Sequence, residues 1–234
     1  GGGGFCAGEP LLRFILAAYT AKPRPPARDG YDDPLLCLGK VLGNVLALKE
    51  GRQRLATGDG GAAAITTLLA EMSDRSRRPD VVSCVRNVCL DADCHPSVVE
   101  TDLIDRMASF LYPWEKVDEE HRKALPEALQ EALASNGAAL TGDSTVRNAS
   151  AISILALCDT CAGREYLRAR GCSEVGRAWL AEEADSEVKQ IVESLLPHVL
   201  LSEEDYQIKL KRDKSGAAAG AVASEVKVET EEGS

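Results

Sequence analysis

Cys158 and Cys161 form the only C-x-x-C motif in the chain, within the stretch CDTCAGREYL. Such a pair can supply half of a structural zinc site or a redox-active dithiol. A zinc site needs four converging ligands, and no second knuckle is present in the sequence. We expect the motif at the C-terminal end of an apolar helix, where the dipole disfavours a thiolate. We therefore predict packing cysteines without metal or redox function, and keep a zinc- or thiol-dependent protein as an alternative.

The other candidates for catalysis are scattered along the chain. Cys84, Cys89 and Cys94 are spaced by five along a predicted helix and its end, so they do not converge on one point. The three histidines lie in different segments, as His95, His121 and His198. No Ser/His/Asp or Cys/His set is suggested, and the HExxH motif is absent. We predict lone polar histidines, no catalytic residue, no cofactor and no enzymatic activity.

Composition and charge narrow the possible partners. The net charge of −10 argues against a nucleic-acid binder, since phosphate binding needs a basic face. No apolar run approaches the ~20 residues of a membrane span, so we expect no membrane association. Of the eight cysteines, Cys37, Cys84, Cys89, Cys158 and Cys172 fall within apolar helical patterns, which indicates a reducing compartment. We expect a cytoplasmic monomer, and interpret the start GGGG, without Met, as that of a fragment.

The elements that would position these residues are helices. In the stretch 35–48, apolar residues recur at the i, i+3, i+4, i+7 spacing of one helix face. Further helices are predicted over 62–72, 81–90, 173–183 and 185–200. Asp80 is expected to cap the third of these five helices, and Asp185 or Ser186 the last. No alternating strand pattern occurs, so the sequence predicts an all-α protein.

Internal repetition indicates how the helices are organised. Residues 42–60 and 154–171 share an apolar helix followed by Gly-Arg-x-x-Leu, with Gly51 and Arg52 matching Gly163 and Arg164. We expect each glycine to end a helix and each arginine to bond its last carbonyls. Asn87 follows Asn44 by 43 positions (87 − 44), within the armadillo/HEAT period of about 40–47 residues. The sequence thus predicts an armadillo/HEAT-like helical-repeat solenoid.

Three regions follow from this pattern. Residues 1–34 form an N-terminal fragment with a partly disordered linker, and residues 35–201 hold the armadillo-like repeats. Residues 113–138 interrupt the repeats with prolines and an acidic run, which we interpret as a solvated loop or, alternatively, a segment that docks on a basic partner. Residues 202–234 are charged, rich in Ala and Gly, and predicted to be a disordered C-terminal tail.

Asn44 and Asn87 are the candidate partner-binding residues. In armadillo proteins, asparagines at such positions line a groove and bond an extended peptide, because the amide offers both a donor and an acceptor. Alternatively, each amide only satisfies a neighbouring helix end. Arg86, Arg147 and Asn148 are predicted to contribute to the same surface.

Several stretches resemble the Hgh-type armadillo family of eukaryotes, in matching order over residues 35–205. They are RNVCLD (86–91), DEEHRKALPEALQ (118–130) and the block that begins VRNASAISILALCDTCAGREYLRARG (146–171). The resemblance implies a cytosolic, non-enzymatic adaptor that helps translation elongation factor 2 to fold with the TRiC/CCT chaperonin. A different armadillo or HEAT scaffold, in transport or phosphatase assembly, is the alternative.

Overall fold

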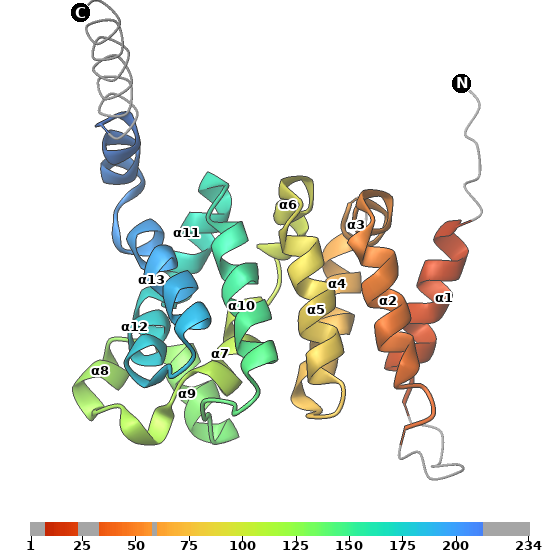
Figure 1. The fold of residues 1–234 in the computed structure, drawn as a ribbon, viewed down its shortest axis with the longest axis horizontal. Helices are drawn as coiled ribbons and strands as arrows, with labels where there is room; N and C mark the ends of the chain where they lie inside the picture. The colour runs from red at the N-terminus through yellow and green to blue at the C-terminus, as the bar shows by residue number, and fades with distance from the viewer. Residues whose placement is uncertain (1–7, 23–32, 58–59, 213–234) are drawn as a thin grey trace, which may run out of the picture. The chain divides into compact units, whose positions relative to one another are not determined.

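The computed structural model describes residues 8–22, 33–57 and 60–212 (Figure 1). The chain divides into two compact units, residues 1–199 and 200–234. The described residues are helical with no strand, which confirms the all-α prediction. The α-helices are α1 (Gly8–Thr20), α2 (Cys37–Ala47), α3 (Lys49–Ala56), α4 (Gly61–Leu69), α5 (Arg78–Cys89), α6 (His95–Val98), α7 (Leu103–Leu111), α8 (Glu119–Lys123), α9 (Glu127–Asn136), α10 (Ser144–Leu157), α11 (Cys161–Ala169), α12 (Cys172–Glu182) and α13 (Ser186–Leu200). Short 3-10 helices are η1 (Ala70–Ser73), η2 (Ala92–Cys94) and η3 (Trp114–Lys116).

Three helices, α2, α5 and α10, lie side by side across the first unit (Figure 1). Helix α1 packs beside α2, and α4 packs against both α5 and α7. A continuous apolar core runs through the row, with Leu42, Val85 and Ile154 buried on its three helices. Each group of helices extends the core of the previous one, as in a solenoid. The predicted helical-repeat solenoid is thereby confirmed.

The repeated Gly-Arg pair forms a tight joint between two helices. The sequence predicted that each glycine ends a helix, and this is wrong. Gly51 and Gly163 lie in the first turn of the next helix, α3 or α11. A Cβ atom would stand 2.0 Å from the Val45 carbonyl oxygen at Gly51, and 1.9 Å from that of Leu157 at Gly163. The joint therefore requires glycine for close approach, not as a helix end.

The arginines of the joint do what the repeat predicts. Arg52 Nη1 donates to the carbonyl oxygens of Leu46 and Ala47, at 3.2 and 2.9 Å. Arg164 Nη1 donates to the Cys158 carbonyl oxygen at 2.6 Å. Each guanidinium thus satisfies carbonyls that the end of the preceding helix leaves without a partner.

The interruption at 113–138 is folded, which corrects its interpretation as a solvated loop. It contains η3, α8 and α9, and its Leu125, Leu129 and Leu133 are buried in a small core of their own. That core also takes Tyr112 and Val175, from just after α7 and from α12. Leu129 and Leu133 lie at i and i+4 on one face of α9, which accounts for their burial, and Leu125 precedes the helix in the turn after α8.

Two predicted helix caps and the predicted C-terminal tail can be compared with the structure. Asp80 does not cap its helix, because α5 begins at Arg78 and places Asp80 in the first turn. Asp185 caps α13, accepting from the amides of Glu187 and Val188 at 3.0 and 3.2 Å. In the predicted tail, residues 203–212 are helical, and residues 213–234 lie outside the described part of the chain.

The N-terminal region contains more structure than a linker. Helix α1 buries Leu12, Leu16 and Tyr19 in the shared core, and residues 23–32 lie outside the described part. No helix in the described ranges combines the length and apolar character that a bilayer crossing needs.

Candidate functional site

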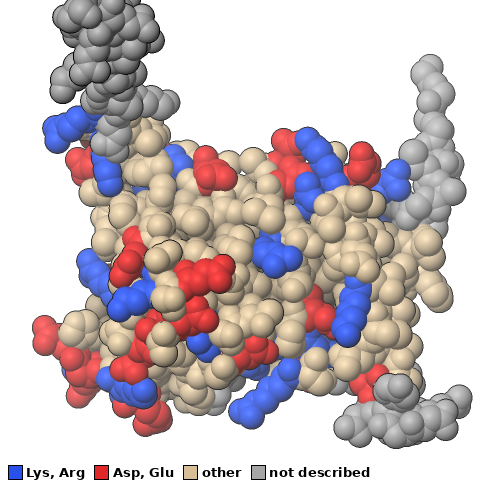
Figure 2. All heavy atoms as spheres, in the orientation of Figure 1, with Lys and Arg blue, Asp and Glu red and all other residues tan. Residues whose placement is uncertain are grey.

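The predicted partner-binding asparagines lie on the three helices of the central row. Asn44 is exposed on α2, while Asn87 on α5 and Asn148 on α10 are half-buried. Figure 2 shows mainly uncharged side chains over α2 and α5, and charged atoms gathering around α12, α13 and the lower edge. The row therefore presents a largely uncharged surface that carries amide groups. We call the exposed sides of α2, α5 and α10 the helix-row face.

Asn87 combines the two roles that the sequence left open. Its Nδ2 donates to the Gly43 carbonyl oxygen at 3.1 Å and so links α5 to α2. Its Oδ1 accepts from Arg86 Nη2 at 3.4 Å, so Arg86 stays beside it at the half-buried surface. The amide is thus held in place by the neighbouring helix, while its side chain remains partly accessible.

Arg147 does not belong to this surface, which corrects the prediction. Its Nε and Nη2 donate to the two carboxylate oxygens of Glu183 at 2.8 and 2.9 Å, and its Nη1 donates to the Thr141 carbonyl oxygen. Burial alone would raise the pKa of Glu183. Hydrogen bonds from Arg147, Asp185 and Trp179 outweigh burial and hold that pKa below its ordinary value. Arg147 is therefore a buried structural cation.

The two cysteines of the C-x-x-C motif lie in different environments. Cys158 follows α10 and is buried, and burial raises the pKa of its thiol to about 12. Cys161 is exposed and begins α11, so only Cys158 lies at the helix end that the sequence predicts for the motif. Its Sγ lies 3.7 Å from Glu165 Oε1. Across the described segments, no group of three or more His, Cys, Asp and Glu side chains could hold a metal ion.

His95 is a structural link that the sequence did not reveal. It is buried, with Nε2 2.7 Å from the Cys89 carbonyl oxygen and Nδ1 3.0 Å from Thr160 Oγ1. Thr160 caps α11, so the imidazole joins the end of α5 to the start of α11. The prediction of a lone polar histidine is wrong here, because the partner is 65 residues away. His121 on α8 is exposed and bonded to Asp118, the residue that caps the same short helix.

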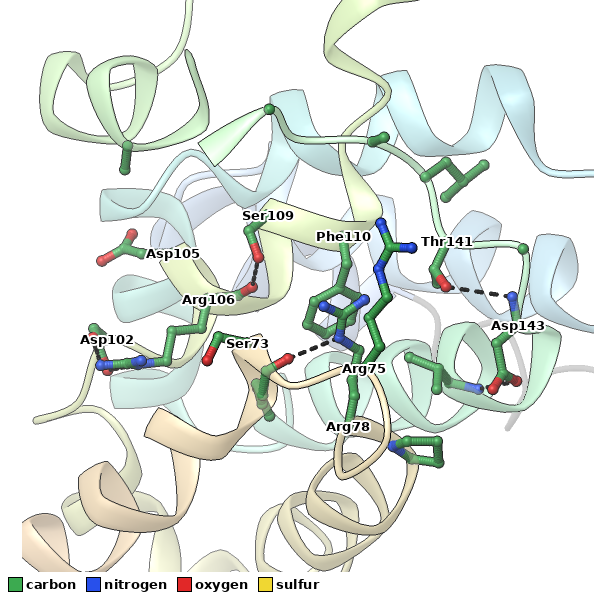
Figure 3. A pocket seen from close by; sticks show the side chains of 18 residues that line it. Ser73, Arg75, Arg78, Asp102, Asp105, Arg106, Ser109, Phe110, Thr141 and Asp143 are labelled. Atoms are coloured by element: carbon green, nitrogen blue, oxygen red, sulfur yellow. Dashed lines mark hydrogen bonds and ion pairs between the residues drawn. The ribbon is translucent and has the colours of Figure 1, made fainter. Parts of the chain in front are cut away.

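A pocket of about 790 Å³ lies between the η1–α5 turn, α7 and the segment that leads into α10 (Figure 3). Its lining includes Arg75, Arg78, Arg106, Phe110 and Thr141. Sequence reasoning missed the pocket because three separate segments build it. We call it the arginine pocket.

Comparisons with known proteins agree with the motif order. The family described as Domain of unknown function (DUF383) matches residues 25–147. Protein HGH1 homolog of Xenopus tropicalis is 29% identical over 201 residues, covering 84% of this chain and 53% of the relative. The chain thus spans about half the length of that relative. The crystal structure of an engineered protein covers 82% of this chain and 91% of its own at 12% identity, with a TM-score of 0.28, too low to establish a shared arrangement.

Proposed function

The chain belongs to the DUF383, Hgh-type family, and on that basis we propose that it is a non-enzymatic adaptor that binds protein clients in the cytoplasm. The client we propose is translation elongation factor 2, which the adaptor would bring to the TRiC/CCT chaperonin. The observation that carries the adaptor role is the likeness to Protein HGH1 homolog over 84% of the chain. The choice of client rests on the motifs that the chain shares with Hgh-type proteins.

The helix-row face has the chemistry of a protein-binding surface. A standard interface buries about 800 Å² on each partner, and an extended row of helices offers that kind of area. Leu48, at the end of α2, and Leu90, at the end of α5, are 63% and 57% exposed. Apolar side chains beside oriented amides would supply both burial and hydrogen bonding to a client segment.

The test of the client is affinity purification of the full 234-residue chain from eukaryotic cytosol. We expect elongation factor 2 and chaperonin subunits among the recovered proteins. Recovery of transport or phosphatase components in their place would favour the alternative scaffold and exclude the proposed client.

The test of the face is the double variant Asn44→Ala/Asn87→Ala. We expect less elongation factor 2 to be recovered while the helical content by circular dichroism is retained. Gln53→Ala is the matched control, because it removes an amide on α3 that bonds Asp93 and lies outside the row. If wild type, the double variant and Gln53→Ala all recover the same amount of elongation factor 2, the asparagines are not part of the binding surface.

A further inference from the structure

The arginine pocket is lined by equal numbers of arginines and aspartates, but its aspartates are paired within the protein to a greater extent than its arginines. Its three aspartates are occupied: Asp102 pairs with Arg106 at 2.8 Å, Asp105 pairs with Arg170, and Asp143 caps α10 by accepting from the amides of Thr145 and Val146. Two further cations, Arg75 and Arg78, form no ion pair with a carboxylate of the described residues, although the charge of Asp74 acts on Arg78. The pocket therefore contains positive charge that its own acids do not neutralise.

Arg78 is held rigidly by groups that leave its terminal amines available. Its Nε donates to the Met72 carbonyl oxygen at 2.8 Å, and its guanidinium carbon lies 4.7 Å from the centre of the Phe110 ring. These two contacts fix the plane of the guanidinium, as Figure 3 shows. Neither terminal amine donates a hydrogen bond to the described part of the chain. A planar fork fixed in this way is suited to a carboxylate, which it can bind through two parallel bonds.

Arg75 adds a second positive charge beside the first. It is exposed in the turn before α5, and Figure 3 shows its side chain next to that of Arg78. Burial lowers the pKa of Arg78, the charge of Arg75 lowers it further, and the Asp74 carboxylate opposes both effects. The neighbouring Asp74 directs Oδ1 to the amide and hydroxyl of Ser76, at 2.8 and 2.7 Å. Two adjacent cations favour the arrival of an anion from outside the chain.

The rest of the lining decides which anion fits. Ser109 and Thr141 offer hydroxyl groups, and Phe110 and Leu140 offer apolar walls, so the pocket suits a peptide more than a bare ion. A volume of about 790 Å³ also exceeds what a single inorganic ion fills. A polyanion such as nucleic acid would meet the aspartates of the lining and a net charge of −10.

We propose that Arg75 and Arg78 form a docking site for a carboxylate side chain of an acidic peptide segment on a partner protein. The site uses none of the helix-row asparagines, and it does not depend on the identity of the client. Although the chain as a whole is acidic, this pocket brings two adjacent arginines together and would therefore select for a negatively charged partner.

The test is fluorescence anisotropy with the full chain and two labelled probe peptides, (Glu-Gly)4 and (Gln-Gly)4, at physiological salt. We expect the glutamate peptide to bind and the glutamine peptide not to bind. Arg75→Ala and Arg78→Ala should each weaken binding about ten-fold, the effect of losing one charge-assisted contact. Arg78→Lys should also weaken it, since lysine keeps the charge but has no planar fork.

Two controls keep the result decisive. Arg54→Ala removes the same charge from an exposed arginine on α3 and should leave the affinity unchanged. Arg75 is exposed and forms no ion pair within the described part of the chain, so Arg75→Ala reports on the site even if Arg78→Ala unfolds. The proposal is overturned if the wild type does not bind the glutamate peptide, if Arg54→Ala weakens binding as much as Arg75→Ala, or if inorganic phosphate displaces the peptide at far lower concentration than acetate.

Discussion

Nη1 of Arg77 and Oε2 of Glu71 lie 3.0 Å apart, and both side chains are only 1% exposed. The same guanidinium pairs with Asp33 through Nη2 at 2.6 Å and stacks on the Tyr19 ring at 4.4 Å. It also donates to the Tyr19 carbonyl oxygen. One buried cation therefore connects α1, the segment before α2 and the turn before α5.

Arg77→Ala should destabilise the fold strongly. The substitution leaves the buried Asp33 carboxylate without this cation and removes the buried partner of Glu71, which keeps Lys22 3.1 Å from its Oε1. Breaking a buried ion pair costs about 3–5 kcal/mol in comparable cases. Urea unfolding followed by circular dichroism measures the change. Arg54→Ala, at an exposed position, should change the free energy of unfolding by less than about 0.5 kcal/mol. A loss below about 1 kcal/mol for Arg77→Ala would contradict the importance of this network.

Glu183→Gln should weaken the fold at neutral pH and alter its response to acid. The pKa of Glu183 is lowered from its ordinary 4.5, so its ionised form stabilises the native state above that value. That contribution is lost as the pH falls through the lowered, native-state pKa. In the wild type, the free energy of unfolding should therefore fall with acidification below about pH 4.5.

The variant lacks this titrating group, so its unfolding free energy should fall less steeply over the same range. At pH 7 it leaves Arg147 without an anionic partner, and we expect a loss of about 3 kcal/mol. Guanidinium unfolding at several pH values measures both effects. Parallel pH profiles for wild type and Glu183→Gln would show that the ion pair does not control acid stability.

Gly51→Ala and Gly163→Ala should each destabilise the solenoid at one joint. The new Cβ would lie about 2 Å from a backbone carbonyl oxygen of the preceding helix, so α3 or α11 must shift. Forced overpacking of this kind costs about 1–3 kcal/mol. Gly142→Ala is the matched control, because no atom lies within 4 Å of its added Cβ. Thermal unfolding should show a lower Tm for the first two variants and no decrease for the third.

Local patterns in the sequence predicted helices and the positions of two joints. The apolar spacing of 35–48 identifies α2 closely, and the repeated Gly-Arg pair marks where α3 and α11 pack on the helices before them. The role of the arginine at the joint was predicted correctly, because its carbonyl partners lie within a few residues. The glycine was predicted to end a helix, and the close backbone approach that requires it became visible only in the structure.

Contacts between distant segments were not predictable in the same way. The triplet Val-Arg-Asn occurs at 85–87 and 146–148, yet Arg86 is half-exposed and Arg147 is buried. The difference arises because Glu183, 36 residues further on, meets Arg147 from the end of α12. The pairing of His95 with Thr160 and the arginine pocket also arise from contacts between segments that are far apart in the sequence. In the insertion, by contrast, Leu129 and Leu133 on α9 carried a helical signal that the prolines and charges obscured.

Cys161 should react with a thiol reagent far faster than Cys158 in the native protein. Cys161 is exposed at the start of α11, where a reagent can reach its thiol. Cys158 is buried, and its thiol pKa is raised to about 12, so little thiolate is present at pH 8. Titration with Ellman's reagent should lose one fast equivalent in Cys161→Ser and none in Cys158→Ser. Equal fast reaction of both thiols would indicate an open, dithiol-like site.

Combining the two substitutions in one double variant tests whether the C-x-x-C motif has a function of its own. A structural zinc site would need two further ligands converging on Cys158 and Cys161. Among the described residues, no group of three or more His, Cys, Asp and Glu side chains could hold a metal ion. We therefore expect no stoichiometric zinc by elemental analysis of the purified chain, and undiminished recovery of elongation factor 2 with Cys158→Ser/Cys161→Ser. One zinc per chain that disappears in this double variant would replace the packing role of the cysteines with a metal-binding one.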